Sequence, residues 1–198
     1  MSHLKYLALG DSYTIGEAVQ ANERWPHQLV ELLNSEGINI ELPEIIAVTG
    51  WTTDELQTAI VEKQPTNDHD LVSLLIGVNN QYRNYPIEIY RKEFTELLNS
   101  AISFGKKIFV VSIPDYGVTP FGKEKEPEKI ATEVDDYNGI AKGICGSLNV
   151  PFIDITRASK LAKSNPKMTA SDGLHPTGEM YSLWANEVFP VVHNLLKE

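Results

Sequence analysis

The chain has 198 residues, of which 42% are apolar and 22% charged, a composition that is ordinary for a soluble globular protein. This length suits one domain with a full core and is short for two, so we expect a single domain over residues 1–198. The net charge of −10 makes nucleic acids and anionic membrane surfaces unfavourable partners.

Location and cofactor use are indicated by what the sequence lacks. It has no run of about 18 apolar residues that would span a membrane, and its first residues lack the pattern of a signal peptide. We therefore expect a cytoplasmic protein, although a secreted chain trimmed of its signal would look the same. Cys145 is the only cysteine, and its apolar helical surroundings predict a buried thiol. No His-Glu-x-x-His motif, cysteine pair or carboxylate cluster indicates a metal, and no cofactor is expected.

Short apolar segments alternate with helical patterns along the chain. Five such segments suit buried parallel strands, and they cover residues 4–9, 44–48, 71–76, 108–113 and 151–155. An apolar stripe that begins at Trp25 predicts the first helix, which closes at Gly37. Thr52 and Glu55 form a capping box that opens the second.

Three further helices follow in the second half of the chain. Apolar stripes over residues 87–101 and 130–148 predict the third and fourth, and Gly105 ends the third. The last helix is expected to begin near residues 176–177 and to kink at Pro190.

This alternation predicts a flavodoxin-like three-layer α/β/α sandwich. Its centre would be a five-stranded parallel sheet with right-handed crossovers. The one long connection covers residues 114–127 and contains two glycines. A loop of that length in a compact domain is expected to be a lid or a mobile segment.

Two polar blocks near opposite ends of the chain carry groups suited to nucleophilic catalysis. The first is Gly-Asp-Ser at residues 10–12, and the second is Asp-Gly-Leu-His at residues 172–175. A serine hydroxyl becomes a strong nucleophile only when a base takes its proton, and an imidazole oriented by a carboxylate is the usual base. The partners need only meet in space, in any chain order. Taken alone, each block is also an ordinary turn.

Two more blocks offer donors to a developing negative charge. Gly50 follows the second strand, where a glycine lets a backbone N–H approach a ligand closely. Asn79 follows the third strand, and its amide can donate to an oxyanion. Each is also compatible with a simple turn. Because all four blocks lie at the same rim of the predicted sheet, their joint presence favours a site.

Together the four blocks resemble the GDSL-type esterases of the SGNH hydrolase superfamily, and the match spans almost the whole chain. The resemblance implies Ser12 as the nucleophile, His175 as the base and Asp172 as the residue that orients the base. It also implies an oxyanion hole made by the backbone N–H groups of Ser12 and Gly50 and the side chain of Asn79.

The sequence departs from the family pattern at two positions. Tyr13 stands where a leucine often follows the serine, which should matter little to chemistry. Asn80 replaces the aspartate that usually follows the asparagine of the third block. The amide donor is retained, but the anchoring of its loop is expected to differ.

The predicted activity is hydrolysis of small or exposed carboxylic esters, such as sugar acetates, through an acyl-serine intermediate. Thioesters and lysophospholipids are alternative substrates of the same fold. Aromatic residues that follow strands are candidates for the wall of an acyl or leaving-group pocket: Trp51, Tyr82, Tyr85, Tyr116 and Phe121.

Two rival functions use the same fold. A flavin- or phosphate-binding module would place its ligand on the Ser/Thr/Gly-rich loop at residues 12–16, and Asp11 would be positioned to accept a phosphoryl group. A catalytically inactive binding protein is the second rival. The block at residues 172–175 has no role in the first, and the intact serine, aspartate and histidine argue against the second.

Overall fold

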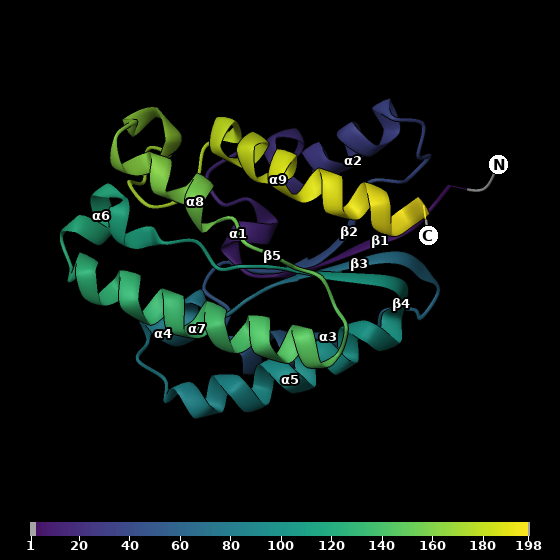
Figure 1. Cartoon of the computed structure of the whole chain (residues 1–198), viewed down its shortest axis with the longest axis horizontal. Helices are drawn as coiled ribbons and strands as arrows, with labels where there is room; N and C mark the ends of the chain where they lie inside the picture. Colours follow the sequence, from purple (N-terminus) through teal and green to yellow (C-terminus); the bar gives the residue numbers. More distant parts are fainter. Residues whose placement is uncertain (1–2, 198) are drawn as a thin grey trace.

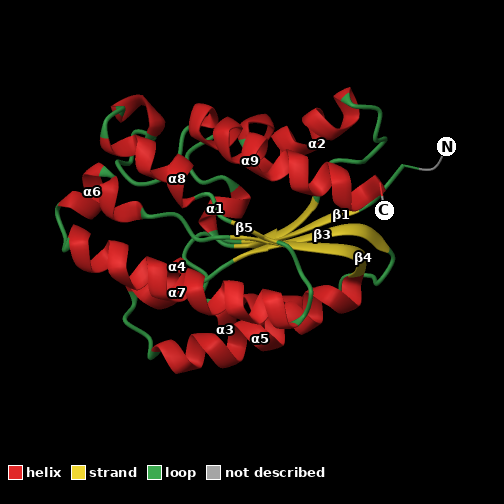
Figure 2. Cartoon of the chain, viewed as in Figure 1, coloured by secondary structure: helices red, strands yellow, loops and turns green. Residues whose placement is uncertain are grey.

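The computed structural model describes residues 3–197, which fold into three layers around one parallel sheet (Figures 1 and 2). The sheet has the order β2-β1-β3-β4-β5, with every neighbouring pair parallel. The strands are β1 (Tyr6–Gly10), β2 (Glu44–Ala47), β3 (His69–Leu75), β4 (Gly105–Val111) and β5 (Phe152–Ile153). The predicted three-layer fold with five parallel strands is confirmed.

Helices cover both faces of this sheet, as Figure 2 shows. One face carries α1 (Ser12–Ile15), α2 (Trp25–Ser35), α8 (Thr156–Ser159) and α9 (Gly178–Lys197). The other carries α3 (Thr53–Lys63), α4 (Val78–Tyr82), α5 (Ile87–Phe104) and α7 (Pro127–Ser147). Every residue of β1, an interior strand of the sheet, is buried, which explains its continuous apolar sequence.

The start of β3 and β4 differs from the sequence expectation. Both strands begin earlier than predicted, where His69 pairs with Gly105. His69 Nδ1 lies 3.0 Å from the carbonyl oxygen of Thr66 and 3.2 Å from that of Phe104, so this polar side chain is satisfied inside the protein. A Cβ on Gly105 would lie 2.6 Å from Val72 Cγ2. The glycine therefore permits close packing of the two strands.

The segment 114–127, which was expected to be a lid or a mobile loop, contains regular structure. It contains a 3-10 turn, η2 (Tyr116–Val118), and a short helix, α6 (Pro120–Lys123). Thr119 caps α6 by accepting a hydrogen bond from the Gly122 N–H at 3.1 Å. The Phe121 N–H donates to the Gly173 carbonyl at 2.9 Å, which fastens the segment to the turn before α9.

Two other expectations concern the helices. α9 begins at Gly178, close to the expected residues 176–177, and continues through Pro190, where a kink was expected, as far as Lys197. Cys145 is buried in α7, as predicted, and burial raises the pKa of its thiol to about 12. Between residues 3 and 197, none of the helices combines the length and apolar character needed to cross a bilayer.

The sheet topology brings three of the four polar blocks to one rim, and the fourth, at residues 172–175, follows short helical segments rather than a strand. The carboxyl ends of β1, β2 and β3 lie side by side because these strands are parallel neighbours in the sheet. The chain leaves them through α1, the loop before α3, and α4 respectively. This is the rim at which open α/β sheets bind ligands.

Candidate active site

Ser12 lies at the first position of α1, directly beyond the end of β1. Asp11 caps this helix, and its Oδ1 accepts a hydrogen bond from the Tyr13 N–H at 3.0 Å. The turn is tight: a Cβ on Gly10 would lie 2.2 Å from Thr14 Oγ1 and 2.5 Å from the carbonyl oxygen of Leu75. Ser12 is 4% exposed and lines a pocket at the rim of the sheet.

A second turn presents His175 to the same pocket. The Asp172 Oδ1 accepts hydrogen bonds from the N–H groups of Leu174, at 2.9 Å, and His175, at 3.0 Å. Gly173 adopts a φ of +74°, which favours glycine. The remaining carboxylate oxygen, Asp172 Oδ2, lies 2.6 Å from His175 Nδ1. One carboxylate therefore folds the turn and holds the ring.

The ionisation of Asp172 fixes the tautomer of the imidazole. Partial burial acts to raise the pKa of this carboxyl, but the N–H of Leu174 and the side chain and N–H of His175 outweigh it, so the pKa is lowered. An ionised carboxylate only accepts hydrogen bonds, which assigns the proton to His175 Nδ1. His175 Nε2 is then left with a lone pair.

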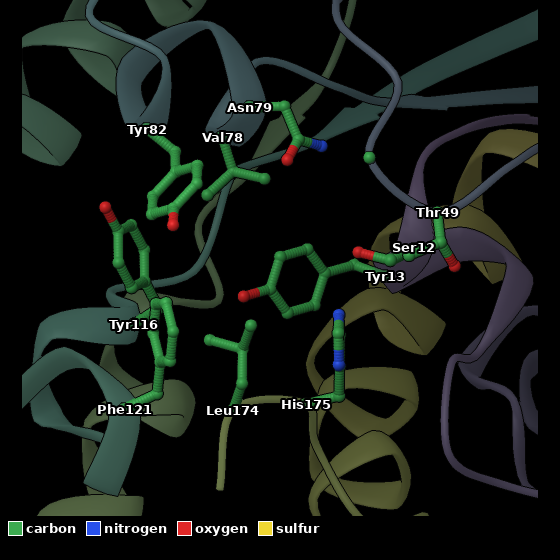
Figure 3. Close-up of a pocket in the computed structure, with 11 residues that line it drawn as sticks. Ser12, Tyr13, Thr49, Val78, Asn79, Tyr82, Tyr116, Phe121, Leu174 and His175 are labelled. Carbon is green, nitrogen blue, oxygen red and sulfur yellow. The ribbon is translucent and has the colours of Figure 1, made fainter. Parts of the chain in front are cut away.

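Figure 3 shows the imidazole of His175 and the hydroxyl of Ser12 turned toward each other across the pocket floor. His175 is 8% exposed and packs against the Tyr13 ring at a centroid distance of 5.5 Å. Among the described residues no hydrogen bond yet joins Ser12 Oγ to the imidazole. In such sites this contact often tightens only when substrate binds.

Two groups that can donate to a negative oxygen border the pocket opposite His175. Asn79 lies on α4, and its Nδ2 donates one hydrogen bond to the Trp51 carbonyl at 2.9 Å. A primary amide carries two N–H groups, so Asn79 keeps a second donor. Gly50 has a φ of +89°. Both residues line the pocket beside Ser12.

The departure at Asn80 has a structural explanation. Asn80 is fully buried and lies outside the pocket lining. Its Oδ1 accepts from the Thr53 N–H at 3.1 Å, and its Nδ2 donates to Thr53 Oγ1 at 2.6 Å. The Thr53 hydroxyl in turn donates to Glu93 on α5. Asn80 thus anchors α4 to α3, while Asn79 faces the pocket.

The pocket has a volume of about 170 Å³ and is mostly apolar. Of the five aromatic residues proposed for its wall, Tyr82, Tyr116 and Phe121 line it, and Trp51 and Tyr85 do not. Val78 and Leu174, which the sequence reasoning missed, complete the apolar wall, as Figure 3 shows. Both lie inside the polar blocks, where only the hydrophilic residues drew attention.

The residues that suggested a phosphate-binding loop have structural roles in the fold. The polypeptide forms the helix α1 over Ser12–Ile15, and the side chains of Tyr13 and Thr14 are buried. Asp11 is also fully buried, so its carboxyl is inaccessible to a phosphoryl donor. Burial raises the pKa of Asp11 to about 7, although the N–H of Tyr13 acts in the other direction.

The protein is a three-layer α/β protein in which a serine and a histidine line one pocket and an aspartate is bonded to the histidine. The model of the GDSL-like lipase/acylhydrolase family matches residues 8–183. The chain therefore belongs to the GDSL-like lipase/acylhydrolase family, as the four blocks predicted.

Two curated relatives are similar in sequence. An acetylxylan esterase from Geobacillus stearothermophilus is 27% identical over 141 residues, which cover 66% of this chain and 62% of the relative. An arylesterase from Vibrio mimicus is 23% identical over 116 residues, which cover 57% of this chain and 58% of the relative. The aligned segments thus span about three-fifths of each relative.

Solved structures share the fold over nearly the whole chain. The acetylxylan esterase Axe2 from Geobacillus stearothermophilus has a TM-score of 0.71 at 21% identity, covering 96% of this chain and 94% of that one. LAE5, an enzyme from the metagenome of Lake Arreo, has a TM-score of 0.70 at 17% identity, covering 100% and 99%. At these identities the likeness establishes the architecture alone.

Proposed function

We propose that this protein is a serine esterase that hydrolyses small or exposed carboxylic esters through an acyl-Ser12 intermediate. The observation that carries the proposal is the placement of three groups around one pocket. Ser12 and His175 both line this pocket. Asp172 Oδ2 lies 2.6 Å from His175 Nδ1. This arrangement leaves His175 Nε2 as the base that faces the serine hydroxyl.

The reaction begins when Ser12 Oγ attacks the ester carbonyl carbon and His175 Nε2 takes the hydroxyl proton. The carbonyl oxygen becomes an oxyanion in a tetrahedral intermediate. When that intermediate collapses, the bond to the leaving oxygen breaks and the imidazolium gives its proton to the departing alkoxide. Water then attacks the acyl carbon, His175 takes its proton, and a second collapse releases the acid and returns the proton to Ser12 Oγ.

The oxyanion is stabilised by donors already in position. We assign this role to the backbone N–H groups of Ser12 and Gly50 and to the second N–H of the Asn79 amide, because these three residues line the pocket. Such donors act mainly on the charge that develops in the transition state, and loss of one typically lowers kcat by about 10²–10³-fold.

Named relatives support this assignment. Two curated relatives are called an acetylxylan esterase and an arylesterase. Structures of Axe2 include catalytic mutants of a serine, an aspartate and a histidine, the last two being three positions apart in that chain. Asp172 and His175 have the same spacing here.

The pocket favours a small acyl group. Its volume is about 170 Å³, close to the roughly 150 Å³ of an apolar cavity that binds benzene. An acyl chain of about six carbons would fill it. Tyr82 stands at its mouth, where 47% of the residue is exposed.

The experiment is a panel of p-nitrophenyl and sugar acyl esters of graded chain length, run with wild type and Ser12→Ala. We expect hydrolysis by wild type, a fall in kcat/KM for acyl chains longer than about six carbons, and no turnover by the variant. A thioester and a lysophospholipid in the same panel separate those alternatives. Turnover that survives in Ser12→Ala, or no turnover of any ester by wild type, would refute the proposal.

A further inference from the structure

The two proposed oxyanion donors beyond Ser12 belong to elements that are not neighbours in the sheet. Gly50 lies in the loop after β2, and Asn79 lies on α4 after β3, with β1 between the two strands. The sheet ladder therefore does not join them directly. The loop is also weakly covered, since Val48 and Thr49 are exposed and Gly50 is half-buried. Side-chain contacts beyond the sheet therefore decide how the Gly50 loop lies beside α4.

Arg83 makes that connection. It follows directly after α4, and its backbone N–H donates to the Asn79 carbonyl at 2.9 Å, so the two residues lie one helical turn apart. Arg83 Nη2 donates to the Gly50 carbonyl at 2.7 Å, and Asn79 Nδ2 donates to the next carbonyl, that of Trp51, at 2.9 Å. Two side chains one helical turn apart, Asn79 on α4 and Arg83 directly after it, thus hold two consecutive carbonyls of the loop.

The carboxylate of Glu55 contacts the other side of the Arg83 guanidinium. Arg83 Nη1 lies 3.3 Å from Glu55 Oε2 on α3. That same oxygen accepts hydrogen bonds from the N–H of Thr52, at 2.9 Å, and from its hydroxyl, at 3.0 Å. The capping carboxylate of α3 therefore also orients Arg83, and the fork of the guanidinium bridges α3, α4 and the Gly50 carbonyl.

We propose that Arg83, oriented by Glu55, is a positioning residue that fixes the Gly50 peptide so that its N–H stays directed at the oxyanion. Arg83 is absent from the residues that line the pocket, which favours a positioning role over direct contact with the substrate. Holding the Gly50 carbonyl fixes the peptide plane between Gly50 and Trp51. This limits the backbone rotation of Gly50, which adopts a φ of +89° and has no side chain to restrain it. The role rests on the proposed function, since it serves the same oxyanion.

The test compares Arg83→Ala, Arg83→Lys and Glu55→Gln with wild type on a p-nitrophenyl ester. We expect Arg83→Ala to lower kcat by about 10–10²-fold with KM changed less than about twofold, because a misplaced donor is lost mainly in the transition state. Arg83→Lys should recover little, since one ammonium cannot bridge two acceptors in the guanidinium geometry. Glu55→Gln should lose less, again in kcat.

Chemical rescue separates positioning from general destabilisation. Added guanidinium should restore part of the kcat of Arg83→Ala and leave Arg83→Lys unchanged. Arg91→Ala is the matched control: Arg91 forms an exposed pair with Glu88 on α5 and is absent from the pocket lining. It should keep wild-type kinetics. Because the Arg83 and Glu55 side chains are 40% and 41% exposed, their pair should contribute little to stability, and Tm should change little.

The outcomes distinguish the two proposals. If wild type and all variants lack esterase activity, and Ser12 is also not labelled by a fluorophosphonate, the proposed function is wrong. Arg83 then has no oxyanion to serve. If wild type is active, three results for Arg83→Ala would show that the positioning role is wrong: a kcat within about twofold of wild type, a loss of activity only through KM, or no rescue by guanidinium. The esterase assignment would still stand.

Discussion

The Asp172 carboxylate makes three hydrogen bonds with two consecutive residues, and these divide between its two oxygens. Oδ1 accepts the N–H groups of Leu174 and His175, and Oδ2 holds the imidazole at Nδ1. Substitution of this residue can therefore change the chemistry without opening the turn, provided that the new side chain keeps an acceptor at Oδ1.

We predict that Asp172→Asn lowers kcat by up to about 10⁴-fold with a nearly unchanged Tm. The amide oxygen would still accept from the two backbone N–H groups, but an amide NH₂ near His175 Nδ1 would favour the tautomer that cannot take the Ser12 proton. Steady-state kinetics on a p-nitrophenyl ester and a thermal melt provide the measurement. An unchanged rate would make Asp172 a turn residue only and leave a Ser12–His175 pair.

A second prediction at the residue scale concerns Asp11 and the pH dependence of the protein's stability. The residue is fully buried, its pKa is raised to about 7, and its Oδ2 has no hydrogen-bond partner among the described residues. In the unfolded chain an aspartate titrates near pH 4. Between these two values the folded state binds more protons than the unfolded state, so this carboxyl lowers stability as pH rises, and the loss levels off above about pH 7.

Asp11→Asn should remove that dependence while preserving the helix cap, because asparagine also accepts at an N-cap. The free energy of unfolding of the variant relative to wild type should rise by about 1.4 kcal/mol for each pH unit between about pH 4 and 7. Urea unfolding of both proteins at pH 5, 6, 7 and 8 measures this difference. A difference that is the same at every pH would show that Asp11 is already ionised in the folded protein at pH 5.

At the scale of elements, α3, α4 and α5 meet at one buried hydroxyl. Thr53 Oγ1 accepts from Asn80 Nδ2 and donates its single proton to Glu93. With asparagine at position 80, the carboxylate that accepts the Thr53 proton in the described part of the chain is Glu93 on α5. The position where the family usually has an aspartate is thus matched by a carboxylate on a different helix.

We predict that Asn80→Asp destabilises the protein and that adding Glu93→Gln restores it. In the single variant two carboxylates would compete for one hydroxyl proton, at a cost of about 1–3 kcal/mol, which corresponds to roughly 2–4 °C in Tm per kcal/mol for a domain of this size. In the double variant the glutamine amide can donate to Thr53 Oγ1. Glu93→Gln alone should have a small effect, because its oxygen still accepts. A double variant as unstable as Asn80→Asp would contradict this account.

At the scale of the whole molecule, one topological fact explains why the sequence was so informative. The strands are parallel, so Ser12, Gly50 and Asn79 could be assigned to one rim from their positions after apolar segments. The fold followed from the alternation of apolar segments with helical patterns, the family followed from the four blocks, and both are confirmed. The roles of the individual residues remain proposals that rest on geometry.

The contacts that the sequence did not predict are long-range and have no local pattern. Arg83 is a single cation after a short helix, and nothing around it points to the Gly50 carbonyl 33 positions away. Glu55 was assigned to its helix cap alone, although it also holds Arg83. Likewise, the fastening of Phe121 to Gly173 becomes visible only once segments distant in sequence are packed together.

The central claim is that Ser12 is the nucleophile activated by His175, and covalent labelling with a fluorophosphonate tests it most directly. Intact-mass analysis should show a single adduct on wild type, peptide mapping should place it on Ser12, and Ser12→Ala should show none. His175→Ala should label far more slowly, because the hydroxyl then lacks its base. An adduct that persists on Ser12→Ala, or wild type that stays unmodified, would contradict the account.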